Sequence, residues 1–428
     1  VGGRTFVGEG NSLTPQNAVV LGTVGSGKTV LTISILSQTE CYRAFTMIVE
    51  EGGAYSTYVK TVDPSAESIV IQANGKLCMN YLDTRGLPLS GLHLSAAAAL
   101  PMLMVGQSKD EDKNRLRQAL LVNAINRLYD DFARSHSNKH PDAWLSLARR
   151  ACALDAWRRE RMGPQATDVD AFLDFGEFQQ AHADEAESFV ARVSESDAVR
   201  FAKDAGTAAQ VRNLVFAEFS PAEYPQHGHL QELLAAEASG SHADEMRYLA
   251  TLLEPWSSNG AYGDLFDGES NVSLTGKIAH FELGYLPESA EELKAMAAFL
   301  IANYTRSHMM RLPRGLRKAN VFEEVARFAL IPTGKKVLRE SYQQLRKYNV
   351  WNLASVQNYE LFKSSDIRGA VLGNSRILFL LRQSDRADVE DLAKDFPIPG
   401  AVQDAVMTHP EPEKIVGQKY SQFTYYHT

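Results

Sequence analysis

The chain of 428 residues is poor in cysteine, has no long apolar run and carries no excess of positive charge. Its three cysteines, Cys41, Cys78 and Cys152, have no metal-binding spacing and cannot all pair, which favours a reducing, cytoplasmic setting. No segment approaches about eighteen consecutive apolar residues, so we expect no transmembrane helix. The formal net charge of −8 argues against a protein coated in nucleic acid, although a local basic channel is compatible with it.

We do not expect the first residues, Val1-Gly2-Gly3-Arg4, to belong to a signal peptide, and the sequence shows no internal repeat or low-complexity tract. It starts at Val1 rather than at a methionine, which suggests a fragment of a longer protein. A hydrophobic content of 44% and a charged content of 22% fit a globular chain with a substantial core. The length predicts two or three structural units.

What the sequence does contain is a glycine-rich loop, GTVGSGKT, between two apolar segments. It matches G-x-x-x-x-G-K-[ST] between an expected strand at 18–21 and an expected helix starting near Lys28. Glycines let backbone N–H groups approach phosphate oxygens, and the helix N-terminus adds positive partial charge. We expect this P-loop to bind ATP, with Lys28 bridging the β- and γ-phosphates and Thr29 ligating Mg²⁺; a chance glycine-rich turn is the alternative. The candidate nucleotide-binding residues are Gly22, Thr23, Val24, Gly25, Ser26, Gly27, Lys28, Thr29 and Val30.

Apolar runs around this loop alternate with helical segments and predict an α/β fold. Strands are expected at 46–49, 68–71, 277–283, 319–322, 350–356 and 376–381. Strands separated by helices imply a mostly parallel sheet flanked by helices. Residues 89–256 carry helical periodicity instead, for example from Leu116 to Phe132. We therefore predict an α/β core at 1–88 and 257–394, an all-helical insertion at 89–256, and a surface arm at 395–428.

Two adjacent acids, Glu323 and Glu324, follow the expected strand at 319–322. Strand C-termini line the ligand crevice of such sheets, and we expect this strand beside the P-loop strand. We assign Glu323 to the Mg²⁺ shell through a water molecule, and Glu324 to polarising the attacking water. A solvated glutamate pair that opens the next helix is the alternative.

Gln357 and three arginines are further candidates around the last two strands. Gln357 ends the strand at 350–356, where its amide can bond the γ-phosphate or its water; a simple polar strand end explains the spacing equally well. Arg346, Arg376 and Arg382 are candidates for a cation delivered to a neighbouring subunit's γ-phosphate. Each of them also fits a surface ion pair.

Two other conspicuous groups favour ordinary structural roles. The pair in His227-Gly228-His229 has no nearby cysteine or acid to complete a metal site, so we expect a surface loop there. The aromatic tail could stack on nucleic-acid bases but is expected to pack on the chain's own surface or on a neighbour. It comprises Tyr420, Phe423, Tyr425 and Tyr426.

The motifs and their order along the chain resemble those of the large cytoplasmic ATPase of type IV secretion and conjugation machines. That family belongs to the HerA–FtsK-like branch of RecA-type motors. The similar segments span nearly the whole chain and are GTVGSGKT, IVEEGGAY, CMNYLDT, YGDLFDG, VFEEVARF, LRKYN and ASVQN. By this resemblance Arg346 matches the family's Arg-Lys motif and Gln357 its sensor glutamine. Two positions depart from it, because Glu323 and Glu50 stand where the family usually has Asp, which allows for slow hydrolysis.

The resemblance implies a P-loop ATPase with ATP and Mg²⁺ as cofactors. It implies a hexamer, peripheral at the bacterial inner membrane, that powers pilus assembly and substrate transfer with other secretion-channel components. Two alternatives stay open: a DNA-pumping coupling ATPase, for which DNA would be a partner, and a nucleotide-binding scaffold with little turnover.

Overall fold

The structure is a computed structural model. It describes residues 17–72, 75–163, 166–236, 240–287, 290–323, 325–326, 338, 341–357, 359–365, 367–410 and 420–427. The chain divides into two compact units, one built from the segments up to Gln72 and from Ser273 onward, the other from Ala73–Val272. The first unit holds the sheet, and the described part of the second holds helices.

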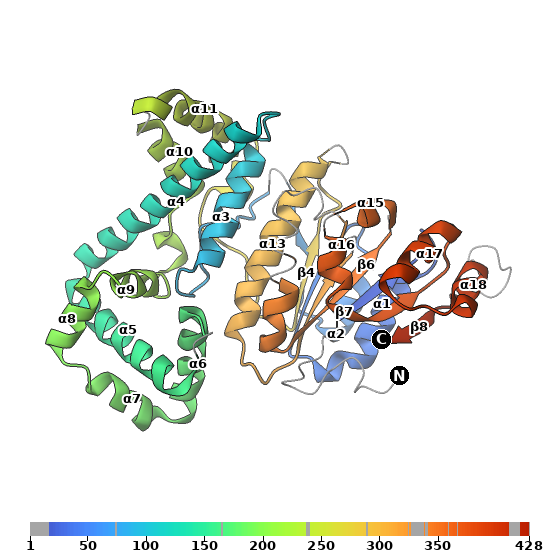
Figure 1. The fold of residues 1–428 in the computed structure, drawn as a ribbon, viewed down its shortest axis with the longest axis horizontal. Helices are drawn as coiled ribbons and strands as arrows, with labels where there is room; N and C mark the ends of the chain where they lie inside the picture. The colour runs from blue at the N-terminus through green and yellow to red at the C-terminus, as the bar shows by residue number, and fades with distance from the viewer. Residues whose placement is uncertain are drawn as a thin grey trace. The chain divides into compact units, whose positions relative to one another are not determined.

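The described strands of the first unit form one eight-stranded sheet in the order β3-β4-β2-β5-β6-β1-β7-β8 (Figure 1). Strands β1 to β7 pair in parallel, and β8 pairs with β7 in antiparallel orientation. The predicted mostly parallel sheet is therefore confirmed. The strands are β1 Asn17–Leu21, β2 Phe45–Glu50, β3 Ile69–Val70, β4 Ile278–Glu282, β5 Lys318–Phe322, β6 Val350–Val356, β7 Ser375–Leu380 and β8 Thr424–His427.

The P-loop strand β1 lies deep in the sheet, between β6 and β7. All five of its residues are buried, as expected of a parallel strand that is covered on both faces. The expectation that β5 lies directly beside β1 is wrong, because β6 runs between them. The carboxyl ends of β5 and β6 therefore both lie on the same side of the P-loop strand.

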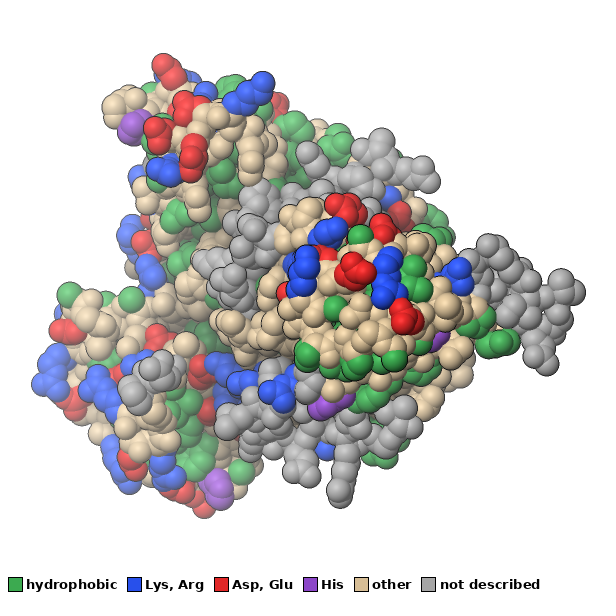
Figure 2. Space-filling view, turned by 45° about the vertical axis from the view of Figure 1, so that its right-hand side comes forward, with side chains coloured by type: hydrophobic (Ala, Val, Ile, Leu, Met, Phe, Trp, Pro, Cys, Tyr) green, Lys and Arg blue, Asp and Glu red, His purple; other side chains and the backbone are tan. Residues whose placement is uncertain are grey.

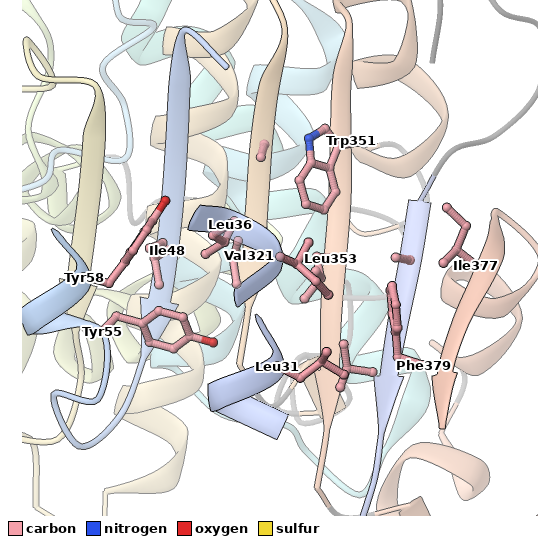
Figure 3. Packing of buried hydrophobic residues seen from close by; sticks show 14 of the residues in the cluster. Leu31, Leu36, Ile48, Tyr55, Tyr58, Val321, Trp351, Leu353, Ile377 and Phe379 are labelled. Carbon is pink, nitrogen blue, oxygen red and sulfur yellow. The ribbon is translucent and has the colours of Figure 1, made fainter. Parts of the chain in front are cut away.

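Helices of the first unit cover both faces of this sheet. On one face α1 and α2 pack on the strands, and Figure 3 shows Leu31 and Leu36 of α1 against the β5 and β6 side chains Val321 and Leu353. On the other face, His308 of α13 lies against the β2 residue Phe45, with ring centroids 4.6 Å apart. The α-helices of this unit whose bounds are described are α1 Lys28–Thr39, α2 Ser56–Val62, α13 Glu291–Arg311, α15 Tyr359–Ser364, α16 Arg368–Leu372, α17 Arg386–Asp395 and α18 Gly400–Thr408.

The C-terminal region is more regular than the expected surface arm. It contributes helix α18 and strand β8, which completes the sheet by pairing Tyr425 with Phe379 and Tyr426 with Leu378. The expected packing of the aromatic tail on the chain's own surface is found for Phe423 and Tyr425, whose rings lie 5.7 Å and 5.6 Å from that of Phe379. Strand β8 has four residues, which are too few for an alternation of apolar and polar residues to reveal it in the sequence. It forms because the edge of β7 is there to pair with it.

The second unit contains ten α-helices among its described residues, and no strand is described within Ala73–Val272. No described helix of the whole chain is both long and apolar enough to cross a membrane. The helices are α3 Gly91–Met104, α4 Glu111–Lys139, α5 Pro141–Arg161, α6 Asp168–Ala181, α7 Ala183–Ala191, α8 Glu195–Lys203, α9 Ala208–Val215, α10 His227–Ala236, α11 Ala243–Leu253 and α12 Gly263–Phe266.

The prediction of a surface loop at His227-Gly228-His229 is wrong, because these residues open helix α10. The His227 side chain is fully buried, and its two ring nitrogens lie 3.0 Å from the Tyr81 hydroxyl and 3.0 Å from the Leu253 carbonyl oxygen. Both partners come from distant parts of the sequence, so local composition gave no sign of them. Burial lowers the pKa of His227 below its ordinary value.

This buried histidine predicts a loss of stability in mild acid. The unfolded chain binds a proton at His227 near pH 6.5, whereas the folded chain resists it, so the free energy of unfolding falls as the pH drops through that value. The slope contributed is at most about 1.4 kcal/mol per pH unit. Urea unfolding of wild type and His227→Gln at pH 7, 6 and 5 measures it. We expect a shallower slope for His227→Gln and no change for the exposed control His242→Gln; equal slopes in all three would contradict this role.

Candidate functional site

The P-loop closes tightly between β1 and α1. Gly25 and Gly27 adopt positive φ angles of 76° and 95°, which glycine adopts at little cost. The Ser26 hydroxyl donates to the Thr23 carbonyl oxygen at 2.7 Å, and the Thr23 N–H donates to the Arg382 carbonyl oxygen at 3.1 Å. The loop is thus fixed both to itself and to the end of β7.

Lys28 lies within this loop as the first residue of α1, with only 5% of its surface exposed. Its Nζ donates to the carbonyl oxygens of Gly22 and Thr23 at 2.8 Å and 2.9 Å. These two carbonyl oxygens hold the ammonium group inside the loop. The geometry suits a polyphosphate chain.

Gly27 also contacts the C-terminal segment directly. A Cβ atom at Gly27 would lie 2.2 Å from the Ser421 Oγ, which itself donates to the Ser26 carbonyl oxygen at 2.6 Å. We expect Gly27→Ala to lower the free energy of unfolding by about 1–2 kcal/mol or more, since a positive φ angle and a steric clash add up. Thermal unfolding measures this effect. The control is Gly400→Ala, which has open space around it; similar melting temperatures for the two variants would contradict the strain.

The first of the two predicted acids reaches the end of the P-loop. The Glu323 Oε1 accepts hydrogen bonds from the Thr29 hydroxyl at 3.1 Å and from the Tyr55 hydroxyl at 2.7 Å. The structure therefore brings together the two residues predicted to hold Mg²⁺. Glu324, the second acid, lies outside the described residues.

The second oxygen of Glu323 is buried and has no hydrogen-bond partner within the described structure. A buried carboxylate oxygen without a donor is costly unless a cation or a water molecule reaches it. The Glu323 residue borders a cavity of about 250 Å³ that is also lined by Thr29 and Gln357. Oxygen donors of hydroxyl and carboxylate type are those that Mg²⁺ prefers, so Thr29 and Glu323 fit this ion.

Two buried carboxylates hold the turn that follows β2. Glu50 accepts the N–H groups of Ala54 and Tyr55 at 2.9 Å and 2.8 Å, and Glu282 of β4, its partner in the sheet register, accepts those of Gly52 and Gly53. His280 lies 2.7 Å from Glu50 through its Nε2. Because their oxygens accept these backbone donors, Glu50 and Glu282 shape the loop.

The remaining candidates differ in where the structure places them. Gln357 follows β6 and lines the cavity with Thr29 and Glu323. Arg346 and Arg376 are exposed, on η6 (Leu345–Tyr348) and on β7. The Arg382 guanidinium donates to the His409 carbonyl oxygen at 2.6 Å, toward the chain's own C-terminal region. None of these arginines lines the cavity as far as it is described.

The residues that sequence reasoning missed are Tyr55, Glu51 and Lys294. Glu51 lines the cavity and pairs with the buried Lys294 of α13, with Oε1 and Nζ 2.6 Å apart. Tyr55 contacts Glu323 as described above. The GGAY segment was noted for its resemblance, but a contact between residues 268 positions apart leaves no local signal.

One cluster in the second unit has metal-binding residue types. Ligand atoms of His136, His140 and Glu223 lie within 4.8 Å of one another. The His136 Nδ1 and the Glu223 Oε1 are 3.2 Å apart and can satisfy each other as a hydrogen-bonded pair. We assign no metal to this cluster.

A P-loop between a buried parallel strand and its helix, with a carboxylate facing it, defines a nucleotide-binding α/β fold of RecA-like type. The structure of VirB4 of Thermoanaerobacter pseudethanolicus has this fold, with a TM-score of 0.65 at 16% sequence identity over 99% of this chain and 91% of that chain. Plasmid coupling protein TrwB in complex with a non-hydrolysable ATP analogue aligns with a TM-score of 0.46 at 11% identity, covering 97% of this chain and 78% of that chain.

In sequence, the chain is 31% identical over 150 residues to Protein TraC of Escherichia coli (strain K12). The matched stretch is 34% of this chain and 17% of that protein, so the chain covers less than two thirds of its relative. No family model matches the chain. The resemblance to the type IV secretion and conjugation ATPases, predicted from the order of the motifs, is confirmed by the match to TraC and by the fold of VirB4.

Proposed function

We propose that the chain is the ATP-hydrolysing part of a motor that powers pilus assembly and substrate transfer in a type IV secretion or conjugation machine. One observation carries this proposal: the Thr29 hydroxyl at the end of the P-loop and the Glu323 carboxylate after β5 meet at 3.1 Å beside a cavity. The sequence match to TraC supports the assignment to this kind of machine.

The P-loop residues bind and orient the triphosphate. Backbone N–H groups of the loop and of the start of α1 would donate to the phosphate oxygens of a bound triphosphate. Lys28 would exchange the carbonyl oxygens of Gly22 and Thr23 for the β- and γ-phosphates. This exchange needs no large movement of the lysine, because its Nζ already lies inside the loop. The loop is therefore prepared for its ligand.

Thr29 and Glu323 would hold Mg²⁺, which when bound neutralises charge on the phosphates and aligns them for displacement. The free, buried Oε2 of Glu323 is the atom that fits this task. Gln357 borders the same cavity and can orient a water molecule or bond the γ-phosphate. We retain Glu324 as the residue that polarises the attacking water, and Arg346 or Arg382 as the cation supplied to a neighbouring subunit.

A phosphate-release assay tests the proposed activity. Wild type is compared with Lys28→Ala and with Glu324→Gln, which remove the phosphate-binding cation and the water-polarising base. We expect ATP-dependent phosphate release from wild type and at most a few per cent of that rate from either variant. Equal phosphate-release rates for all three proteins would contradict ATP hydrolysis and favour the alternative of a nucleotide-binding scaffold.

We further propose a hexamer, peripheral at the inner membrane, working with other secretion-channel components. On the face shown in Figure 2, the described basic and acidic side chains are interspersed, without a continuous basic stripe. We propose the assembly motor first and keep a pump that transports DNA directly as the second candidate. DNA titration at increasing salt separates the two, because a pump that grips phosphates gives a steep salt dependence.

A further inference from the structure

We propose that Tyr55 is a positioning residue that aligns the Glu323 carboxylate for the metal-bound nucleotide. This inference rests on the proposed ATPase function and gives a role to Tyr55, the last residue of the IVEEGGAY segment, for which the sequence indicates no role. It is built on the hydrogen bond between the Tyr55 hydroxyl and the Glu323 Oε1, which are 2.7 Å apart.

The Tyr55 side chain is fixed by its surroundings. It is fully buried and belongs to the core cluster that α1 and α2 form with the sheet, and Figure 3 shows it beside Ile48 and Tyr58. Burial and the nearby Glu323 carboxylate raise the pKa of Tyr55 well above its ordinary value. The Tyr55 hydroxyl donates its hydrogen bond to the Glu323 carboxylate in this arrangement.

A series of hydrogen bonds fixes the backbone N–H of Tyr55. The Ser68 hydroxyl lies 2.8 Å from the His280 Nδ1, and the His280 Nε2 lies 2.7 Å from the Glu50 Oε1. The same Glu50 oxygen accepts the Tyr55 N–H at 2.8 Å. The turn between β2 and α2 is thereby fixed, and with it the direction of the phenol.

This arrangement gives a reason for glutamate at position 323. The Glu323 Oε1 takes two donors, from Tyr55 and Thr29, which leaves the Oε2 directed elsewhere and free. An aspartate is shorter by about 1.5 Å, the length of one C–C bond. Its oxygens would be out of hydrogen-bonding range of the Tyr55 hydroxyl unless the backbone moved.

The closing experiment is a double-mutant cycle of Tyr55→Phe and Glu323→Asp with two readouts. The first readout is Mn²⁺ binding, used in place of Mg²⁺, to the complex with a non-hydrolysable ATP analogue, followed by electron paramagnetic resonance. The second is steady-state phosphate release. The control is Tyr58→Phe, a buried tyrosine of α2 whose hydroxyl accepts from Arg43 at 3.0 Å and does not contact Glu323.

We expect Tyr55→Phe to weaken Mn²⁺ binding and lower kcat by about tenfold to a hundredfold, as for a lost hydrogen bond to a charged group, with metal-free nucleotide affinity unchanged. In the Glu323→Asp background the same change should cost less than about threefold, because the contact is already lost. Tyr58→Phe should stay within about twofold of wild type.

Two results would overturn the proposal: Tyr55→Phe matching Tyr58→Phe in Mn²⁺ affinity, or equal losses from Tyr55→Phe in both backgrounds. Failure of the proposed function gives a different result. Wild type would then release no more phosphate than Lys28→Ala, while the Mn²⁺ titration would still report on Tyr55.

Discussion

Lys28→Ala is expected to remove most of the nucleotide affinity of this chain. Lys28 is almost fully buried, and its ammonium group is held inside the P-loop by the carbonyl oxygens of Gly22 and Thr23. Truncating one partner of a buried, hydrogen-bonded charge pair costs about 2–5 kcal/mol. This corresponds to a Kd for Mg·ATP that is higher by roughly thirtyfold to several thousandfold. Equilibrium binding of a fluorescent ATP analogue measures it.

The control for this variant is Lys60→Ala, which removes an exposed lysine of α2. We expect the Kd of the control to match that of wild type. A Kd for Lys28→Ala within about threefold of wild type would show that the triphosphate does not bind in this loop. Thermal unfolding should accompany the measurement, since Lys28 also ties the loop to itself.

Glu323→Gln is expected to leave ATP binding nearly intact and to lower kcat by on the order of a hundredfold. The amide has the same shape, and its oxygen can accept the hydrogen bonds of Thr29 and Tyr55. The negative charge is lost, however, and a metal ion in its active position depends on that charge for several kcal/mol of transition-state stabilisation. Steady-state kinetics at saturating Mg²⁺ separate kcat from KM.

The control is Glu40→Gln, which removes a carboxylate that pairs with Lys277 near the surface, with Oε1 and Nζ 2.7 Å apart. Its kcat should equal that of wild type. If Glu323→Gln retained at least half of the wild-type kcat, Glu323 would have no role in the chemical step. Glutamate in place of the usual aspartate at position 323 would then indicate that the metal-binding role of this position has been lost.

Much of the fold was predictable because its signals are local. The apolar run at 350–356 corresponds to β6 residue for residue, and the run at 319–322 corresponds to β5 within one residue. The P-loop could be recognised because its glycines, lysine and threonine lie at fixed spacing within the single short segment 22–29. Strand β8 could not, since its four residues form a strand only through the edge of β7.

The candidate site was predictable only in part. Three of its residues could be placed from the sequence: Thr29 ends the P-loop, Glu323 follows β5 and Gln357 follows β6. The carboxyl ends of parallel strands lie at the same edge of a sheet, so these residues come together. The contact of Tyr55 with Glu323 and the role of Glu50 as an acceptor for a turn depend on tertiary structure. The role of Arg346 and Arg382 stays a prediction, because a cation supplied to another subunit cannot be judged within one chain.

The place of β1 in the sheet has a consequence for synthesis on the ribosome. β1 ends at Leu21, yet its two neighbours in the sheet, β6 and β7, start only at Val350 and Ser375. At about 5–20 residues per second, the nascent P-loop strand waits roughly 20–70 s for both partners. A largely apolar strand exposed for that long is prone to aggregate, so we expect expression yields to depend strongly on chaperones that hold unfolded segments and on growth at low temperature.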